Sequence, residues 1–197
     1  MKIINFQIVV FLLFLASEPV LAQKEAKPLK VGDEAFNFMG LDQNGEKVEL
    51  FKVLEKSPVV LMFYRGAWCP YCNKQLSEMQ DSLKFINERG GIVIAVTPEK
   101  PGSIDKTIKK TNASFKIIHD KDLDIMNTYK VRYSLDDAMV KKYKSYGIDI
   151  LKANDKNGAN LPVPATYIID KEKKILYAFF DPDHTKRATV TKILQNL

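Results

Sequence analysis

The chain has 197 residues, of which 46% are hydrophobic, and a formal net charge of +6. This length and composition suit one globular domain with enough chain to bury a core. The lysines are spread along the sequence and do not cluster with aromatic residues. The positive charge therefore favours a solvated basic surface and argues against a nucleic-acid-binding protein.

The N-terminus has the pattern of a secretory signal. The positive start Met1-Lys2 is followed by an apolar run over residues 8–16, which Glu18-Pro19 interrupts. Val20-Leu21-Ala22 then offers the small residues that a signal peptidase reads. We therefore predict a signal peptide over residues 1–22. An uncleaved anchor is the alternative, but the apolar run is short for a membrane span, so we expect no stable membrane insertion.

The rest of the chain divides into two parts. Residues 23–30 are polar and should form a flexible N-terminal segment, and residues 31–197 should form one domain without internal repeats. Export by the signal peptide would place this domain outside the cytoplasm, in the periplasm if the source is a Gram-negative bacterium.

Local patterns predict strands and helices that alternate along this domain. Asn44-Gly45 between apolar residues predicts a tight hairpin, and the apolar run at residues 59–64 predicts a strand buried on both faces. Apolar residues at helical spacing begin at Pro70 and end before Arg89-Gly90, which predicts one helix. Further strands are expected over residues 92–96, 115–118, 166–170 and 175–180, and further helices over 101–112, 123–129, 136–146 and 190–197. This alternation predicts an α/β fold with a mixed sheet covered on both faces.

The two cysteines of the chain, Cys69 and Cys72, form a Cys-Pro-Tyr-Cys motif after a predicted buried strand. A disulfide that closes so short a loop constrains the unfolded chain little, so the pair is a poor structural link and a good redox couple. Cys69 should lie at the first turn of the next helix, where unpaired N–H groups lower its pKa. Cys72 is in register with the apolar stripe and should face the core. We expect an exposed Cys69 to attack and a shielded Cys72 to resolve the mixed disulfide, with Trp68 as a packed shelf.

A metal site is another use for two cysteines. A structural zinc site needs four ligands, and only His119 and His184 remain, at no ligand-like spacing from each other. We expect these histidines to be structural or exposed, and we expect no metal and no other cofactor. A copper(I)-binding module, which soft thiolates would suit, is a third hypothesis.

Residues 63–72, Phe-Tyr-Arg-Gly-Ala-Trp-Cys-Pro-Tyr-Cys, resemble the peroxiredoxin-like branch of the thioredoxin superfamily, the alkyl hydroperoxide reductase/thiol-specific antioxidant type. The resemblance covers about residues 31–197 and includes the opening segment 32–38, residues 94–98 and residues 164–170. It implies a thioredoxin-like fold in which a central mixed β-sheet is flanked by helices and carries an N-terminal β-hairpin extension.

The departures from the family pattern distinguish two activities. Peroxiredoxins have a proline, a threonine and the peroxide-attacking cysteine where this chain has Arg65, Cys69 and Cys72. Their distant arginine would fall near Pro164. The resemblance to thioredoxins implies instead that Val163-Pro164 is a cis-proline pair whose Val163 backbone binds a substrate chain. An ordinary trans proline at a strand start is the alternative for Pro164.

Two further positions bear on the proton and charge balance of the pair. Arg65 would hold the thiolate form of a cysteine in either activity, and a surface arginine at a strand end is its alternative. Thioredoxins bury an aspartate six residues before the first cysteine, where this chain has Phe63. The sequence therefore identifies no general base.

The leading hypothesis is an exported thiol-disulfide oxidoreductase in which Cys69 and Cys72 cycle between dithiol and disulfide. Its partners would be protein or small-molecule disulfides and thiols, together with an upstream thiol electron donor or acceptor. The alternative is a thiol-dependent peroxidase of antioxidant type that reduces hydrogen peroxide or alkyl hydroperoxides. In that case one cysteine is oxidised to a sulfenic acid and the other condenses with it.

Overall fold

The structure is a computed structural model, and it describes residues 28–197. The predicted signal peptide over residues 1–22 lies outside the described residues, as does the part of the 23–30 segment that precedes residue 28.

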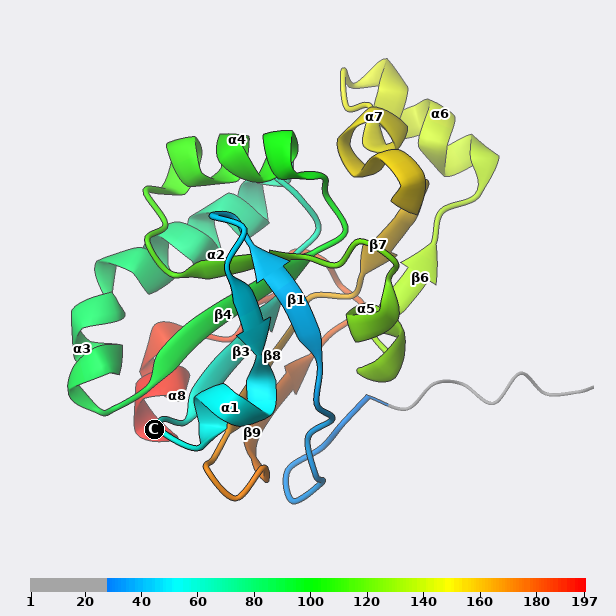
Figure 1. Ribbon diagram of the computed structural model, residues 1–197. Helices are drawn as coiled ribbons and strands as arrows, with labels where there is room; N and C mark the ends of the chain where they lie inside the picture. Colours follow the sequence, from blue (N-terminus) through cyan, green and yellow to red (C-terminus); the bar gives the residue numbers. More distant parts are fainter. Residues whose placement is uncertain (1–27) are drawn as a thin grey trace, which may run out of the picture.

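A seven-stranded mixed sheet forms the centre of the domain, in the order β2-β1-β5-β4-β3-β8-β9 (Figure 1). Its strands are β1 (Met39–Asp42), β2 (Lys47–Glu49), β3 (Val59–Phe63), β4 (Ile92–Thr97), β5 (Lys116–His119), β8 (Ala165–Ile169) and β9 (Ile175–Phe180). β3, β4 and β5 run parallel, whereas β8 is antiparallel to both β3 and β9. Every residue of β3 is buried, as expected of a central strand covered on both faces.

β1 and β2 form the hairpin that Asn44-Gly45 predicted. Gly45 has a φ of +79°, in the left-handed region that glycine adopts without strain, and its N–H donates to the carbonyl of Asp42. β1 also pairs antiparallel with β5, through Leu41 and His119. The predicted N-terminal hairpin extension is therefore confirmed, and it continues the main sheet at one edge.

Two apolar clusters fill the space between the sheet and the helices on its two faces. One face is covered by α1 (Leu50–Leu54) and α5 (Asp124–Thr128). The other face is covered by α2 (Pro70–Asp81), α3 (Leu83–Glu88), α4 (Pro101–Thr111) and α8 (Val190–Gln195), and its cluster includes both cysteines. The predicted α/β fold with a mixed sheet covered on both faces is confirmed.

The single helix predicted from Pro70 to Arg89 is two helices. Ser82 separates α2 from α3 with a φ of −99° and a ψ of 2°, outside the helical conformation. The apolar stripe continues across this break to Ile86, which is fully buried. Hydrophobic periodicity therefore could not predict the break between α2 and α3.

Between α5 and β8 the chain leaves the main sheet for an insertion, which we define as residues 131–162. It contains β6 (Arg132–Ser134), α6 (Asp137–Ser145), α7 (Ile150–Asn154), the 3₁₀ turn η1 (Asp155–Asn157) and β7 (Asn160–Pro162). β6 and β7 form a separate antiparallel ribbon, and α6 and α7 project beyond it (Figure 1). The sequence predicted α6 and missed the rest, because three-residue strands are too short to show an alternating pattern.

Candidate active site

Cys69 ends the loop that leaves β3 and begins α2. The loop turns at Gly66, whose carbonyl accepts the N–H of Cys69 at 3.0 Å. Cys69 caps the helix, since its Sγ accepts the N–H of Cys72 at 3.3 Å, and Pro70 follows at the first helical position, where its missing N–H costs nothing. The predicted placement of Cys69 at a helix start is confirmed.

The two cysteine sulfurs lie together at this helix end. Their Sγ atoms are 2.6 Å apart, so one thiol hydrogen-bonds to the other. Cys72 is fully buried, as predicted, but Cys69 is also buried and only 1% exposed. The expectation of an exposed Cys69 is therefore wrong, because the segment after β9 brings Arg187 onto both sulfurs.

Arg187 supplies a positive charge to the cysteine pair. Its Nη2 lies 3.2 Å from the Sγ of Cys72 and 3.8 Å from the Sγ of Cys69. The carbonyls of His184 and Lys186 accept hydrogen bonds from its Nη1 at 2.7 and 2.6 Å, which fixes the guanidinium in place. Its Nε is buried without a hydrogen-bond partner among residues 28–197. A guanidinium held in this way stabilises negative charge on either sulfur.

The cysteine pair loses its first proton easily and holds the second. Burial alone would raise the pKa of Cys72, but the hydrogen bond from Cys69 and the charge of Arg187 outweigh it and lower that pKa to about 6. The hydrogen bond with Cys72, together with burial, raises the pKa of Cys69. The expected lowering of the pKa of Cys69 itself is wrong, because Cys69 shares a hydrogen bond with the Cys72 sulfur and is buried. The lowered pKa that was expected for Cys69 alone belongs instead to the loss of the first proton from the cysteine pair.

Arg65 and Trp68, two of the predicted site residues, pack together with Tyr143 of α6. Arg65 is buried, its Nη2 donates to the hydroxyl of Tyr143, and its Cζ lies 4.8 Å from the centre of the Trp68 ring. The Trp68 and Tyr143 rings meet edge to face, with centroids 5.3 Å apart. Burial disfavours the charge of Arg65, but Tyr133, Tyr143 and Cys69 outweigh it and raise the pKa. Arg65 is thus a permanent cation, and Trp68 is packed beside the pair.

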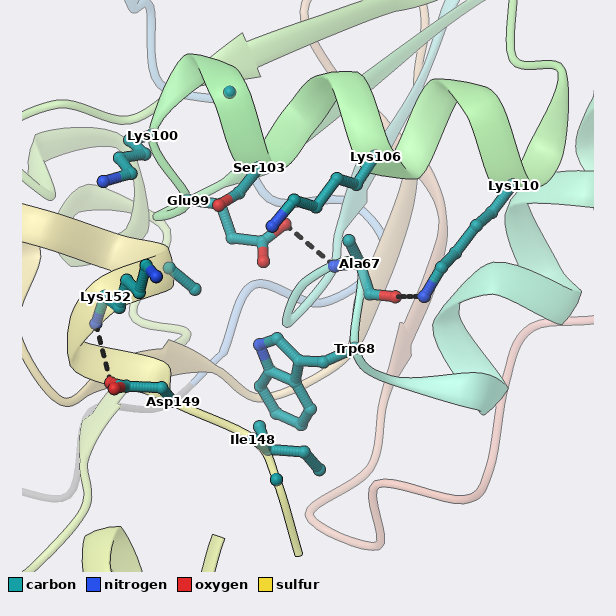
Figure 2. Close-up of a pocket in the computed structure, with 13 residues that line it drawn as sticks. Ala67, Trp68, Glu99, Lys100, Ser103, Lys106, Lys110, Ile148, Asp149 and Lys152 are labelled. Carbon is teal, nitrogen blue, oxygen red and sulfur yellow. Dashed lines mark hydrogen bonds between the residues drawn. The ribbon is translucent and has the colours of Figure 1, made fainter. Parts of the chain in front are cut away.

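Glu99, a carboxyl group that the sequence did not single out, lies against the same loop. It follows β4 by two residues, is 1% exposed, and accepts the N–H of Ala67 at 2.8 Å through Oε2 (Figure 2). Burial raises the pKa of Glu99 to about 7; the Ala67 bond opposes this shift, and the charge of Cys72 adds to it. A carboxyl group that titrates near neutrality therefore lies against the loop before Cys69. The sequence had indicated no such group, because Phe63 stands where thioredoxins have a buried aspartate.

Gly66 is required where Glu99 and Trp68 meet. A Cβ on Gly66 would lie 2.5 Å from Oε1 of Glu99 and 2.6 Å from Nε1 of Trp68, closer than atoms can approach. Its φ of +154° also lies in the region that favours glycine. The loop before Cys69 can therefore pass between these two side chains because residue 66 has no side chain.

Val163-Pro164 lies where β7 leads into β8, but its peptide bond is trans, since the described residues contain no cis peptide bond. The N–H of Val163 donates to the carbonyl of Val131 at 2.7 Å. The expected cis-proline is therefore wrong, and the Val163 N–H is already used within the protein, so it is not available to a substrate chain. The ribbon of β6 and β7 delivers the chain to β8 already extended, and it uses that N–H. Pro164 is an ordinary trans proline before a strand.

The two histidines lie apart and share no site. His119 is partly buried in β5, and His184 is exposed, with its ring edge-on to Tyr71 at 6.1 Å between centroids. Within residues 28–197, no group of three or more His, Cys, Asp or Glu side chains is placed to hold a metal ion. Over the same residues, no helix is both long and apolar enough to cross a membrane.

Sequence reasoning missed Arg187, Glu99 and Tyr143. Glu99 did carry a signal, because the carboxyl ends of adjacent parallel strands meet at one edge of a sheet. A glutamate after β4 must therefore lie near a motif that follows β3. Arg187 and Tyr143 lie in a loop and a surface helix whose patterns gave no such indication.

Residues 31–178 match the model of the AhpC/TSA family. The chain belongs to this family. The match covers the sheet as far as β9 and includes both cysteines, the insertion and Glu99, but it ends before Arg187. The resemblance suggested by residues 63–72 is thus confirmed at the level of the family.

Named relatives include both activities that the sequence left open. Thiol-disulfide oxidoreductase ResA from Halalkalibacterium halodurans is 32% identical over 104 residues, which is 52% of this chain and 58% of that protein. Peroxiredoxin Bcp from Escherichia coli (strain K12) is 29% identical over 104 residues, 53% of this chain and 66% of that protein. The alignments thus span less than two thirds of each of these relatives. Together they support an oxidoreductase that acts on thiols.

Among solved structures, that of Peroxidoxin BcpB from Mycobacterium tuberculosis superposes with a TM-score of 0.66. The two sequences are 21% identical, and the match covers 85% of this chain and 96% of the other. At this identity the likeness concerns the fold, and it confirms the predicted thioredoxin-like architecture.

Proposed function

We propose that this chain is an exported thiol-disulfide oxidoreductase whose redox couple is Cys69 and Cys72. The observation that carries the proposal is the contact between the two sulfurs, 2.6 Å apart at the start of α2, with the Arg187 guanidinium beside them. Two thiols in contact can pass to a disulfide with little movement, and an adjacent cation keeps one of them ionised near neutral pH.

The exchange proceeds in two balanced steps. A thiolate of the pair attacks one sulfur of a substrate disulfide, so that a mixed disulfide forms and the other substrate sulfur leaves as a thiolate. The second cysteine of the pair then loses its proton and attacks the mixed disulfide. The protein is left with a Cys69–Cys72 disulfide, and the substrate with two thiols. An external dithiol restores the reduced protein by the reverse sequence.

We assign the first attack to Cys69. Its Sγ caps α2, where the helix N-terminus favours negative charge, whereas Cys72 lies within the helix on its buried face. The proton shared between the sulfurs lets charge located mainly on Cys72 move to Cys69 as a substrate approaches. Since both sulfurs are buried, Arg187 or the edge-to-face pair of Trp68 and Tyr143 must move before a large substrate can react.

The test is reduction of a disulfide substrate by the wild type and by single cysteine variants. We expect Cys69→Ser to lose the first step. We expect Cys72→Ser to stop at a stable mixed disulfide through Cys69, visible by mass spectrometry. Full turnover by Cys69→Ser would exclude the mechanism, and a mixed disulfide formed only through Cys72 would reverse the assigned roles.

A thiol peroxidase is the second candidate, and the closed site favours it. A peroxide is small enough to reach a pair that is screened from solvent, and Arg187 can donate hydrogen bonds to a peroxide oxygen as well as to a sulfur. One sulfur would be oxidised to a sulfenic acid and the other would expel water to form the disulfide. Stopped-flow fluorescence of Trp68 during oxidation by hydrogen peroxide separates the two candidates. A rate far above that of a free thiol would establish the peroxidase, and a rate like that of a free thiol would exclude it.

Export rests on the sequence of residues 1–22. We propose that cleavage after Ala22 releases a mature protein beginning at Gln23. Cell fractionation followed by N-terminal sequencing tests this proposal. An intact Met1 in the mature protein would refute cleavage.

A further inference from the structure

A pocket of about 520 Å³ lies between α4 and α7, directly beside the loop that leads to Cys69 (Figure 2). Ala67 and Trp68 form one of its walls, and Lys100, Lys106, Lys110 and Lys152 surround it. Its size is that of a site for a small molecule. A space large enough for a small molecule therefore lies against the loop that leads to Cys69.

The charges of the pocket are unbalanced toward the positive. Four lysines face two acidic residues, Glu99 and Asp149. Asp149 is already used, because its carboxylate accepts the backbone N–H of Lys152 at the start of α7. Among residues 28–197, Lys100, Lys106 and Lys152 form no ion pair. The N-terminus of α4 also opens here, through Gly102 and Ser103, and adds to the positive potential.

The wall beside the loop holds a donor and an acceptor without partners. Nε1 of Trp68 is buried and has no hydrogen-bond partner among the described residues. Glu99 bonds to Ala67 through Oε2, and residues 28–197 offer no partner to its Oε1. Both atoms lie close to Gly66: Glu99 Oε1 is 2.5 Å, and Trp68 Nε1 2.6 Å, from the point that a Cβ on Gly66 would occupy. A buried indole N–H without an acceptor is costly, so an oxygen atom of a ligand or of a water molecule that reached it would be stabilised there.

We propose that this pocket binds the carboxylate end of a low-molecular-weight disulfide or thiol, whose sulfur exchanges with Cys69 and Cys72. The inference rests on the proposed function and names the substrate class for it. The lysines neutralise the carboxylate, and Trp68 Nε1 donates to it. Glu99, which burial keeps partly protonated near neutral pH, can donate to it as well. Neither cysteine lines the pocket, but Trp68, which directly precedes Cys69 in the chain, forms one of its walls, so we expect the disulfide of a ligand anchored here to extend past Trp68 toward the pair.

The first experiment compares three disulfides of similar length and different charge: 3,3′-dithiodipropionate, 2-hydroxyethyl disulfide and cystamine. Their rates of oxidation of the reduced protein are divided by their rates with dithiothreitol, which removes intrinsic reactivity. We expect the anionic disulfide to exceed the neutral one by about tenfold or more, as hydrogen bonds to a charged group allow. The cationic disulfide should be the slowest of the three.

Lysine variants separate the pocket from Arg65 and Arg187, which also attract anions. In Lys100→Gln/Lys106→Gln/Lys152→Gln, the ratio of the anionic to the neutral rate should fall toward one. The single variant Lys106→Glu, at an exposed position, should lower it in the same direction if the triple variant folds poorly. Lys171→Gln is the matched control, because Lys171 is exposed in the turn between β8 and β9, and it should keep the wild-type ratio.

The second experiment measures binding without redox chemistry. Glutarate, a dicarboxylate without sulfur, is titrated into Cys69→Ser/Cys72→Ser while the fluorescence of Trp68, the single tryptophan of the chain, is followed. We expect saturable binding that the lysine variants weaken by about tenfold.

The outcomes separate this proposal from the one it rests on. Reaction with none of the three disulfides would overturn the proposed function and the substrate role of the pocket together. Equal normalised rates, a preference that survives the lysine substitutions, or no saturable binding of glutarate would overturn the pocket proposal and leave the disulfide chemistry standing.

Discussion

Nη2 of Arg187 lies 3.2 Å from Sγ of Cys72, although 115 residues separate the two in the chain. The C-terminal segment thus returns to the start of α2 and places a cation on the sulfur that the helix buries. A positive charge at this distance favours the thiolate over the thiol, which links the reactivity of the motif to a residue far outside it.

Replacing Arg187 by Gln should raise the pKa at which the pair loses its first proton. With Arg187 present, the pKa of Cys72 is about 6. Loss of an opposite charge in contact raises a pKa by about 1 to 3 units, so thiolate formation should require a higher pH. The pH dependence of alkylation by iodoacetamide measures this midpoint. Arg89→Gln, at the exposed end of α3, is the control and should keep the wild-type value. An unmoved midpoint in Arg187→Gln would contradict the assignment.

Glu99 should make the folded protein less stable as pH rises toward neutrality. Its pKa is about 7 in the folded protein, against an ordinary 4.5, so its contribution to stability is complete below pH 4.5 and is lost as pH rises through about 7. Relative to Glu99→Gln, the parent should lose on the order of 2 to 3 kcal/mol of unfolding free energy between about pH 5 and pH 8.

Chemical denaturation of the parent and of Glu99→Gln at each pH measures this difference. The Cys69→Ser/Cys72→Ser background removes the titration of the thiols from the comparison. Parallel pH profiles for the two proteins would show that the carboxyl group titrates in the folded protein as it does in the unfolded one.

Gly66→Ala should destabilise the protein and disturb the loop before Cys69. The new Cβ would meet Glu99 and Trp68 at 2.5 and 2.6 Å, and the backbone there has a φ of +154°. We expect a loss of about 1 to 3 kcal/mol in unfolding free energy, together with altered Trp68 fluorescence. Gly102→Ala is the matched change, since Gly102 lies in α4 with open space around it. It should be neutral or stabilising, and equal effects at both positions would argue against a specific fit at Gly66.

Tyr143→Ala should open the cysteine pair to large reagents. Tyr143 accepts a hydrogen bond from Arg65 and packs on Trp68, whereas α6 as a whole has no buried residue, so this side chain is its main attachment at the site. Losing it should speed the reaction of the pair with a bulky aromatic disulfide by about tenfold, the effect of one hydrogen bond to a charged group. Tyr146→Ala, at a position 68% exposed just beyond the same helix, should leave the rate unchanged. Equal rates for the two variants would locate the barrier elsewhere.

The sequence predicted the parts of this protein that local chemistry determines. The buried run at residues 59–64 became β3, Asn44-Gly45 became a hairpin turn, and Cys69 came to lie at the start of α2. Each of these features depends on residues within a few positions of one another. Periodicity, turn preference and helix capping report such features directly.

The charged environment of the site could not be predicted in the same way. The lowered pKa of Cys72 depends on its contact with Cys69 and on Arg187, which reaches the pair from a loop without a recognisable pattern and also helps to cover Cys69. The cis-proline expectation failed because the ribbon of β6 and β7 fixes how the chain enters β8. Tertiary contacts of this kind leave no periodic trace in the sequence.

The insertion of residues 131–162 contributes to the surroundings of the site but not to the cysteine pair itself. It supplies Tyr143, which contacts Arg65 and Trp68, and it supplies α7 to the lysine-lined pocket, while both sulfurs and Arg187 belong to the chain outside it. Its two ends are paired with each other in the β6–β7 ribbon, and Ala153 and Asn157 also bond to the chain that follows β4 and β5. Sequence changes on the outer faces of α6 and α7 can therefore alter what approaches the site while both sulfurs and Arg187 stay in place, provided that the contacts of Tyr143 with Arg65 and Trp68 are kept.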